Sequence, residues 1–388
     1  MSKIFDLINE LCPDGVEFKE LGEIFQRIKG TNITANKMKE IEVHGGDIRI
    51  FAGGKTVIDT TEDKIQNPNI TRVPSVIVQS RGVIDFIYYD KPFTFKNEMW
   101  GYTSENETSI KFLYYYLKNN ISYFRAASIS MGALPQISLP ITEKFKLPVP
   151  PMEVQREIVR ILDSFTLLTA ELTAELTAEL TARKKQYEFY RDFLLSFDEL
   201  DKNGGGCELK MLGEILGYTQ PANFIVNDTN YKEKFGIPVL TAGQSFLLGY
   251  TNETFGIYKA LKNPTIIFDD FTTSFQWVDF DFKVKSSAIK ILNNRDNQKT
   301  NFRFVYYAMR CIKFEPTNHE RYWISKYSKI KIPVPSLQTQ QKVVDILDKF
   351  DTLVNSITEG LPREIELRRK QYEHYRELLL NFKPKMRA

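Results

Sequence analysis

A four-residue unit, Thr-Ala-Glu-Leu, is written three times and begun a fourth time between residues 169 and 182. Alanine, glutamate and leucine are strong helix formers, and no glycine or proline interrupts the run, so it predicts the middle of a long helix. Apolar residues continue at spacings of three and four from Ile158 to Phe197. A helix of roughly 45 residues would be about 65 Å long. An apolar stripe along a helix of this length is too long for one globular core and predicts packing of helix against helix.

The chain also contains a candidate partner for this helix. Residues 146–197 return as residues 331–382, with the same offset of 185 at both ends and no gap between. Two arms of equal length predict an antiparallel helix pair related by a pseudo-two-fold axis. Within the second arm, Gly360, Leu361 and Pro362 predict a kink or a break opposite the repeats.

The two stretches that precede the arms resemble each other more loosely. Short runs recur in the same order with small insertions between them: VEFKELGEI from Val16 and CELKMLGEI from Cys207, then IKFLYYYLK from Ile110 and FRFVYYAMR from Phe302. Between such runs the residues differ almost completely. Two domains that share one fold but have different surfaces, joined to near-identical arms, explain this contrast.

The residue pattern within these stretches predicts mixed α/β domains. Residues 2–11 and 109–118 have helical apolar spacing, whereas the apolar runs at 48–52 and 75–79 are typical of strands. We therefore expect an α+β chain with two globular mixed α/β domains separated by two long antiparallel helices. The expected boundaries are 1–150 for the first domain, 151–202 for the first arm, 203–335 for the second domain and 336–388 for the second arm.

Composition narrows the classes of protein to which this chain can belong. The formal net charge is +3 over 388 residues, so charge alone argues only weakly for nucleic-acid binding. Three cysteines at wide spacing exclude a disulfide framework and favour a reducing cytoplasm. No apolar run approaches the roughly 18 residues of a membrane span, and the N-terminal segment lacks the pattern of a signal peptide. We expect a cytoplasmic protein without membrane contact.

Two variable domains alternating with two near-identical helical arms resemble the specificity subunit of Type I restriction–modification enzymes. Each arm is entered through a PVPP or PVPS segment with a glutamine soon after, and each contains an ILD-F run and a KQYE-YR run. The TAEL repeat between the domains is a further mark of this family. The residues that carry the resemblance are 148–151, Gln155, 161–163 and 184–195 in the first copy, and 333–336, Gln340, 346–348 and 369–380 in the second.

The resemblance implies a non-catalytic subunit that reads double-stranded DNA. Each globular domain would be a target recognition domain for one half of a bipartite, asymmetric sequence, and the arms would dock two methyltransferase subunits. Restriction subunits would join this core, which would methylate adenine or cleave unmodified DNA with ATP. S-adenosylmethionine would then be bound by the methyltransferase subunits, and ATP with Mg²⁺ by the restriction subunits, leaving this chain without a cofactor.

Several loops carry side chains suited to DNA contact. Ser80, Arg81 and Gly82 follow a strand, where glycine permits a tight turn and arginine can bind guanine through two hydrogen bonds. Lys55 projects from the loop at 53–56, and Gln136 precedes the final strand of the first domain. The corresponding loops of the second domain carry Gln244, Ser245, Thr272, Ser274, Arg321 and Tyr322. Taken alone, each loop is better explained as an ordinary surface turn, and the argument for DNA contact is the occurrence of these loops at matching places in the two domains.

The arms carry candidates for partner docking and for spacing the two domains. These are the repeat leucines Leu172, Leu176 and Leu180, and two basic clusters, Arg183, Lys184 and Lys185 in the first arm and Arg368, Arg369 and Lys370 in the second. A solvated helix face is the alternative for the basic clusters, and phosphate contact is a third. Each TAEL unit adds about 6 Å of helix, which corresponds to roughly one to two base pairs of DNA.

Motifs for an enzyme are incomplete. The GGKT run at 53–56 lacks the first glycine of a phosphate-binding loop, and NPNI at 67–70 lacks the second proline and the aromatic of the adenine-methyltransferase motif. His44, His319 and His374 lie far apart without ligand spacing. We expect no catalytic residue and no metal site. Two alternatives stay open: a stand-alone DNA methyltransferase or nuclease, and a coiled-coil scaffold without DNA recognition.

Overall fold

The computed structural model describes residues 2–131, 134–204, 206–243, 245–318, 320–355 and 360–385. The chain divides into two compact units. The first unit comprises Met1–Glu175 together with Ile365–Ala388, and the second unit comprises Leu176–Glu364. Each unit contains one sheet region and parts of both arms, so the chain enters the first unit twice.

The sheet region of the first unit is built from short, mostly antiparallel strands. Its four-stranded sheet has the order β2-β8-β5-β6, with β2 (Gln26–Lys29), β8 (Trp100–Thr103), β5 (Ser75–Gln79) and β6 (Asp85–Tyr89). A three-stranded sheet has the order β4-β3-β7, with β4 (Val57–Thr60), β3 (Ile48–Phe51) and β7 (Phe93–Phe95), and β3 and β7 are parallel. Two strand pairs complete it: β1 (Phe18–Glu20) with β11 (Lys146–Pro148), and β9 (Ile129–Met131) with β10 (Leu134–Gln136). The strands predicted at 48–52 and 75–79 are confirmed.

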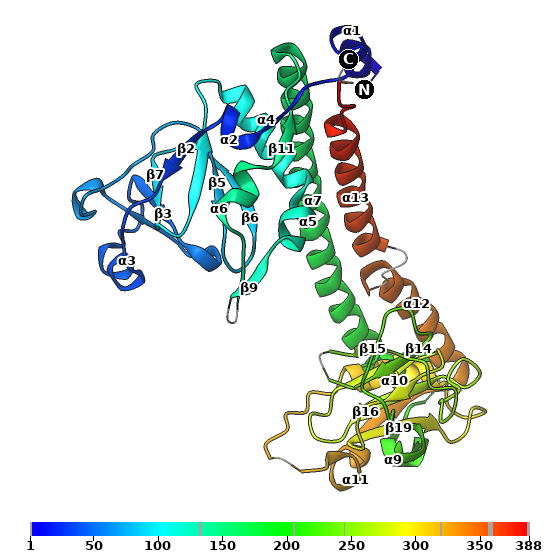
Figure 1. The fold of residues 1–388 in the computed structure, drawn as a ribbon. Coiled ribbons are helices and arrows are strands. Elements are labelled where there is room, and N and C mark those ends of the chain that lie inside the picture. Colours follow the sequence, from blue (N-terminus) through cyan, green and yellow to red (C-terminus); the bar gives the residue numbers. More distant parts are fainter. Residues whose placement is uncertain are drawn as a thin grey trace. The chain divides into compact units, whose positions relative to one another are not determined.

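One helix joins this sheet to the arm. The helix α4 (Glu107–Asn119) begins at Asn106, whose side chain accepts hydrogen bonds from the backbone N–H groups of Thr108 and Ser109. It lies between the four-stranded sheet and α7 (Met152–Leu194), as Figure 1 shows. Val78 of β5, Leu113 of α4 and Ile158 of α7 are fully buried in the same apolar cluster. The helix predicted at 109–118 is therefore present, and it anchors the sheet region on the arm.

The sheet region of the second unit repeats this plan. Its four-stranded sheet has the order β13-β19-β16-β17, with β13 (Leu216–Thr219), β19 (Ile289–Asn294), β16 (Thr265–Asp269) and β17 (Phe275–Val278). Its three-stranded sheet has the order β15-β14-β18, with β15 (Leu247–Thr251), β14 (Ile237–Leu240) and β18 (Lys283–Val284). The pair β12 (Glu208–Met211) and β20 (Lys331–Val334) corresponds to β1 and β11, and α10 (Phe302–Arg310) corresponds to α4. The loose sequence repeat is thus a repeat of fold.

Short helices connect these strands. In the first unit they are α2 (Leu21–Ile24), α3 (Ala35–Ile41), η1 (Gly53–Lys55), η2 (Glu62–Lys64), α5 (Ile121–Ala126) and α6 (Leu139–Glu143). In the second unit they are α8 (Phe197–Gly204), α9 (Leu212–Ile215), η3 (Ala222–Phe224), α11 (Tyr322–Ser325) and η4 (Tyr327–Lys329).

The first arm is one helix and the second is two. The helix α7 contains the whole TAEL repeat, as predicted, whereas the second arm consists of α12 (Leu337–Asn355) and α13 (Gly360–Leu380). Gly360 has a φ of +76°, and a Cβ at this position would lie 2.6 Å from the carbonyl oxygen of Leu353. Only glycine fits this backbone. Pro362 lies in the first turn of α13, where its missing N–H costs no helical hydrogen bond. The predicted break is confirmed at this point.

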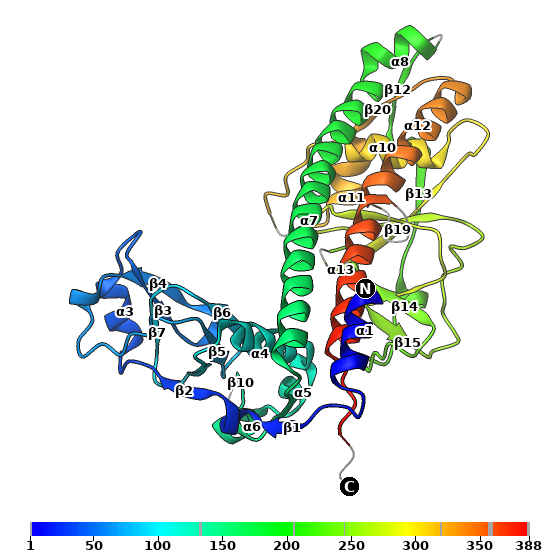
Figure 2. The same cartoon turned by 90° about the horizontal axis from the view of Figure 1, so that it is seen from above.

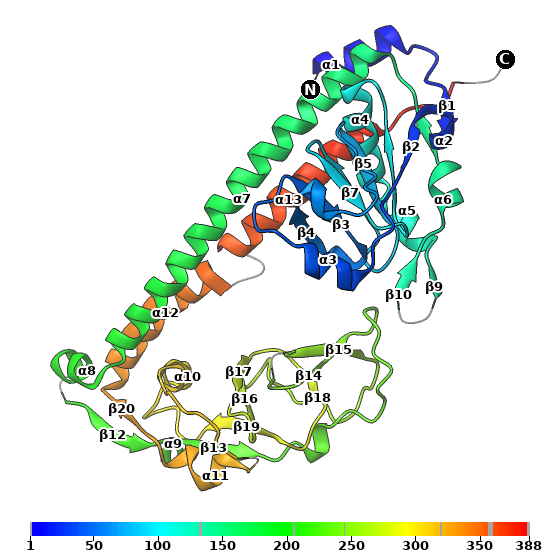
Figure 3. The same ribbon diagram turned by 90° about the vertical axis from the view of Figure 1, so that its left-hand side faces the viewer.

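The arms pack against each other within each unit. In the first unit, α7 and α13 run antiparallel, because Phe165 contacts Tyr375 while the hydroxyl of Thr166 is hydrogen-bonded to that of Tyr372 at 2.9 Å. Figure 3 shows α13 alongside α7. In the second unit, Tyr190 of α7 stacks on Phe350 of α12. The predicted antiparallel pairing of the two arms is therefore present in both units.

Both ends of the chain lie in the first unit. Figure 2 shows the N-terminal helix α1 (Ser2–Leu11), which was predicted at 2–11, beside α13. Ile4 of α1 is buried in the same cluster as Leu379 and Leu380. The N–H of Val16 donates to the carbonyl of Lys383 at 2.9 Å, and the N–H of Lys385 donates to the carbonyl of Val16 at 2.8 Å. The N-terminal segment thus completes the core at the end of the second arm.

Candidate nucleic-acid interface

Three loops singled out from the sequence meet at one place in the first unit. Beyond the end of β5 at Gln79, Arg81 is paired with Gln136 in an isolated antiparallel β-bridge. The N–H of Gly82 donates to the carbonyl of Pro135 at 2.9 Å. A Cβ on Gly82 would lie 3.6 Å from the Cα of Gly54, so the loop between β3 and β4 touches this bridge. The sequence predicted each loop separately, and the fold brings them together.

The individual side chains in this cluster have different roles. Arg81 is exposed and Gln136 is half-buried, so both can reach a ligand. Ser80 is fully buried, and its hydroxyl donates to the carbonyl of Glu98 at 2.8 Å. Gly82 has a φ of +79°, a backbone conformation that favours glycine at this position. The side chain of Lys55 lies outside the described part of the structure. Ser80 therefore holds the loop, and Arg81 is the side chain that the loop presents.

Two polar residues that the sequence analysis passed over lie beside this cluster. Glu98 pairs with Lys96 at 2.9 Å, which neutralises the acidic group next to the loops. Gln79 is 3% exposed, and its amide nitrogen has no hydrogen-bond partner among the described residues. Because buried amides are almost always hydrogen-bonded, this nitrogen is a donor available to water or a ligand. A glutamine at the end of a buried strand gives no sequence pattern that would have revealed it.

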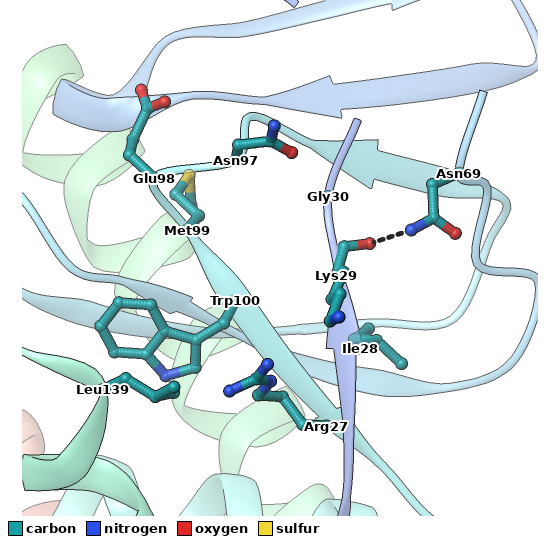
Figure 4. Close-up of a pocket in the computed structure, with 10 residues that line it drawn as sticks. All are labelled: Arg27, Ile28, Lys29, Gly30, Asn69, Asn97, Glu98, Met99, Trp100 and Leu139. Carbon is teal, nitrogen blue, oxygen red and sulfur yellow. Dashed lines mark hydrogen bonds between the residues drawn. The ribbon is translucent and has the colours of Figure 1, made fainter. Parts of the chain in front are cut away.

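A pocket of about 490 Å³ opens beside the cluster at the edge strand β2. Glu98 lines it and also belongs to the loop cluster. Figure 4 shows the Arg27 side chain extending toward Trp100, and the Asn69 amide donating to the carbonyl of Lys29. Arg27 and Lys29 are exposed, and Arg27 lies 3.4 Å from Glu143. Two cations, two amides, an indole and one carboxylate line this pocket, and its cations and amides are of the kinds that contact nucleic acid.

The second unit places its candidate loops at the equivalent positions. The carbonyl of Asp270 accepts from the N–H of Tyr322 at 2.8 Å, as the carbonyl of Ser80 accepts from Ile137 in the first unit. Asp270 is 1% exposed, and its carboxylate accepts from the N–H of Trp323 and lies 3.5 Å from the Lys290 ammonium. A buried ion pair therefore fixes the second loop where a serine hydroxyl fixes the first.

The residues predicted for the second unit also divide into exposed and structural groups. Arg321 is exposed, and its guanidinium lies 5.9 Å from the ring centre of Phe271. Ser245, Thr272 and Ser274 are exposed. Tyr322 is 1% exposed, and its hydroxyl both donates to and accepts from the backbone of Asn318, so it holds the loop. Gln244 lies outside the described residues.

An acidic residue of each ILD run connects the arm to the sheet region. In the first unit, Asp163 accepts from the Tyr115 hydroxyl at 2.6 Å and from the Lys111 ammonium at 3.1 Å. In the second unit, Asp348 accepts from the hydroxyl of Tyr307 at 2.5 Å and from Arg303 at 2.9 Å. Burial, followed by these hydrogen bonds to carboxylates, raises the pKa of both tyrosine hydroxyls. The tyrosines thus stay protonated and donate.

The predicted docking residues of the arms lie partly within helix packing. Leu172 lines a groove of about 190 Å³ between α7 and α13, together with Arg368. Leu176 and Leu180 are half-buried. Three of the basic residues form ion pairs along their own helix: Arg183 with Glu179, Arg369 with Glu373, and Lys370 with Glu366. Arg183 is half-buried, whereas Lys184, Lys185, Arg369 and Lys370 are exposed.

Exposed apolar side chains on the arms were missed by the sequence analysis. Phe189 and Phe193 of α7 are 66% and 47% exposed, and their rings stack on each other 6.4 Å apart. On α13, Leu378 is 42% exposed and lies at the position that corresponds to Phe193 after the 185-residue offset. The two arms therefore expose an apolar residue at the same place. The shared offset could have revealed it.

The described residues contain no group of three or more histidine, cysteine, aspartate or glutamate side chains that could hold a metal ion. Among the helices of the same residues, none is long and apolar enough to cross a bilayer.

Comparisons with known proteins agree with this organisation. The family model of the Type I restriction modification DNA specificity domain matches twice, over residues 13–182 and 206–367. The Escherichia coli specificity subunit of the EcoR124I/EcoR124II type I restriction enzyme is 48% identical over 198 residues, which are 49% of this chain and 48% of that protein. A putative specificity subunit from Haemophilus influenzae is 36% identical over 75% of this chain and 77% of that protein.

The fold is also found in a solved structure. A chain from work on complex assembly and conformational transition of the type I restriction–modification system has a TM-score of 0.62. The match covers 95% of this chain and 98% of that chain, at 11% identity. The alignment with the Escherichia coli relative, in contrast, spans about half the length of each protein.

Proposed function

Because this chain belongs to the family of Type I restriction–modification DNA specificity proteins, we propose that it is the subunit that selects the DNA sequence for a multisubunit methyltransferase and endonuclease. Each sheet region contacts one half of a bipartite, asymmetric target. The arms hold the two regions at a set separation along the DNA. The chain itself performs no chemistry.

The proposed division of the chain follows the repeat. Residues 1–150 and 203–335 are the two target recognition domains, and residues 151–202 and 336–388 are the arms. The repeated fold supports this division, because β5, β8 and α4 of the first unit have counterparts in β16, β19 and α10 of the second.

One observation carries the proposal: equivalent positions in the two units hold unlike side chains of the kinds that read bases. Arg81 and Gln136 are neighbours across a β-bridge in the first unit. The residues at the same two places in the second unit are Phe271 and Arg321, which are also in contact. Arginine and glutamine bind guanine and adenine edges in the major groove. One framework with different residues at the reading positions supports two different half-sites.

The partners follow from the same proposal. Two methyltransferase subunits dock on the arms, one on each copy of the repeat, and the exposed apolar residues at Phe193 and Leu378 support such contacts. Restriction subunits join this core in the cytoplasm. S-adenosylmethionine is bound by the methyltransferase subunits, and ATP with Mg²⁺ by the restriction subunits. The methylated base is adenine.

The two alternatives have no observation in their favour. A stand-alone methyltransferase or nuclease needs its own cofactor or metal motif, and the family match over both halves of the chain is to a specificity domain. A scaffold without DNA recognition gives no reason for an exposed arginine within the candidate loops of each unit.

A matched pair of variants tests the proposal. In the complex with methyltransferase subunits, Arg81→Ala is expected to relax selectivity for the first half-site, and Arg321→Ala for the second, by about ten-fold or more each. Arg160→Ala removes an exposed charge from α7 and serves as the control, with both half-sites unchanged. Equal loss at both half-sites in either variant, or no loss in both, contradicts the proposal.

A further inference from the structure

The hairpin β9–β10 and the Arg81 loop form one continuous surface in the first unit. Gln136 of β10 pairs with Ile129 of β9, and Leu134 pairs with Met131. On its other side, Gln136 is bridged to Arg81 by hydrogen bonds from Gly82 to Pro135 and from Ile137 to Ser80. Arg81, Gln136 and Ile129 therefore form a row across three adjacent backbone segments. Figure 3 shows this hairpin projecting from the sheet region.

The register decides which side chains share a face. Residues directly opposite each other in antiparallel pairs project to the same side, and so do residues two apart along a strand. Arg81, Gln136, Ile129 and Leu134 consequently lie on one face. The neighbouring residues Ser80 and Ile137 lie on the opposite face. Their exposed fractions of 0% and 1% agree with this, since that face is turned toward the protein interior.

This face is open to solvent and mixed in chemistry. Ile129 is 63% exposed and Leu134 is 47% exposed. The side chain of Arg81 makes no hydrogen bond or ion pair with any described residue. Two aliphatic side chains beside an unpaired cation and an amide do not match a lipid surface or an apolar protein interface. They match a base-pair edge, where hydrogen-bonding groups lie next to the 5-methyl group of thymine.

We propose that Ile129 and Leu134 recognise the 5-methyl group of thymine in the first half-site, beside the base edges that Arg81 and Gln136 contact. A two-stranded ribbon fits the major groove, which is about 12 Å wide and displays that methyl group. This inference rests on the proposed function and deepens it, because it assigns a chemical group of the DNA to a named face. It also predicts that the first half-site contains at least one A·T pair.

The second unit provides an internal comparison. The residues equivalent to Arg81 and Gln136 are Phe271 and Arg321, and residues 311–318 and 320–321, which precede α11, contain no strand. The second half-site is therefore not read by a hairpin of this kind. Replacing thymine in that half-site tests whether an effect is specific to the hairpin.

The experiment uses the full chain with its methyltransferase subunits and a duplex that carries the mapped target. Each thymine of the first half-site is replaced with uracil, which lacks only the 5-methyl group. For the unaltered chain, we expect affinity to fall by about three- to ten-fold, as for removal of one or two buried methyl groups. The double variant Ile129→Ala with Leu134→Ala should bind the thymine and uracil duplexes within about two-fold of each other.

Two controls isolate the effect. Uracil in the second half-site should change affinity equally in the variant and the unaltered chain. Because both replaced side chains are exposed, the double variant should have the same midpoint of denaturant unfolding as the unaltered chain. The variant Leu134→Met keeps an apolar side chain at this position and should retain the preference for thymine.

The failures of this inference and of the proposed function are distinguishable. Equal binding of the thymine and uracil duplexes by the unaltered chain overturns the inference, as does a variant that keeps the preference or a first half-site without an A·T pair. In each of these cases the complex still prefers its target over a scrambled duplex. If the complex shows no preference for its target over a scrambled duplex, the proposed function and this inference both fail. A variant that loses methyltransferase binding would assign the face to a protein partner and overturn the inference.

Discussion

The ring of Phe165 in α7 lies 5.7 Å from the ring of Tyr375 in α13, and the two planes are inclined by 52°. The second unit has the same contact between Phe350 and Tyr190, at 5.9 Å. Phe350 follows Phe165 by 185 positions, and Tyr375 follows Tyr190 by the same number. The second contact therefore repeats the first: the phenylalanine comes from the first arm in one unit and from the second arm in the other. Antiparallel packing of two sequence repeats requires this arrangement.

Removing either tyrosine ring should weaken its unit. Tyr375→Ala and Tyr190→Ala are each expected to lower the free energy of unfolding by about 1–2 kcal/mol, because the rings are only partly buried but contribute area and an aromatic pair. Denaturant unfolding followed by circular dichroism measures this. Leu167, which is 62% exposed, is the control: Leu167→Ala should change stability by less than about 0.5 kcal/mol. Two tyrosine variants as stable as the unaltered chain would show that the contact contributes nothing.

The exposed aromatic pair on α7 should affect partner binding and not stability. Replacing Phe189 and Phe193 together with alanine is expected to weaken binding of a methyltransferase subunit by about ten-fold or more, because exposed aromatic side chains are frequent interface hot spots. Titration of the chain with that subunit measures the affinity. The unfolding midpoint should remain that of the unaltered chain. Unchanged affinity would exclude this surface from the docking site.

A second buried ion pair of the second unit, between Lys283 and Glu253, should be essential to the stability of that unit. Lys283 and Glu253 are 2.6 Å apart, with side chains only 1% and 9% exposed. Lys283→Met leaves the Glu253 carboxylate buried without its cation and is expected to cost about 3 kcal/mol of unfolding free energy. Adding Glu253→Gln should recover part of this loss. A double variant that is less stable than Lys283→Met alone would contradict this explanation.

The same pair predicts a pH dependence. Burial alone would raise the pKa of Glu253, but the Lys283 ammonium and the N–H groups of Asp228 and Asn227 outweigh it and lower the pKa below its ordinary 4.5. A carboxyl with a lowered pKa stabilises the folded state fully above the pKa of the unfolded chain. Unfolding measurements should therefore show this contribution intact above about pH 4.5 and lost as the pH falls through the lowered pKa. The Glu253→Gln variant should lack this part of the acid sensitivity.

Deleting one repeat should change the spacing of the target and nothing else. Removal of residues 173–176 shortens α7 by about 6 Å and is expected to shorten the unspecified gap between half-sites by roughly one to two base pairs. Both half-sites should stay the same, because no loop residue is altered. Mapping of methylated sites for the deletion gives the gap directly, and an unchanged gap would separate the repeat from spacing.

Much of the fold could be predicted because the sequence contains an internal repeat. The offset of 185 between Asp163 and Asp348 predicted equivalent arms, and both residues bind a tyrosine and a cation of their own sheet region. The break at Gly360 followed from glycine and proline chemistry alone.

The candidate interface could be predicted only in part, because strand register is invisible in a single sequence. In the structure, Arg81 pairs with Gln136, and Gly54 lies against Gly82. No local sequence pattern predicts either contact. Ser80 and Tyr322 have the residue types of surface loops, yet backbone groups of Glu98 and Asn318 occupy their hydroxyls. Burial of such polar residues depends on long-range packing, which local pattern does not contain.

The most direct test of the account is a genome-wide map of methylated adenines in cells that contain this chain and its methyltransferase subunits. The account predicts a single bipartite motif: two unlike specified half-sites separated by an unspecified gap of constant length. Methylation at a continuous or palindromic site, or none that depends on this chain, would contradict it.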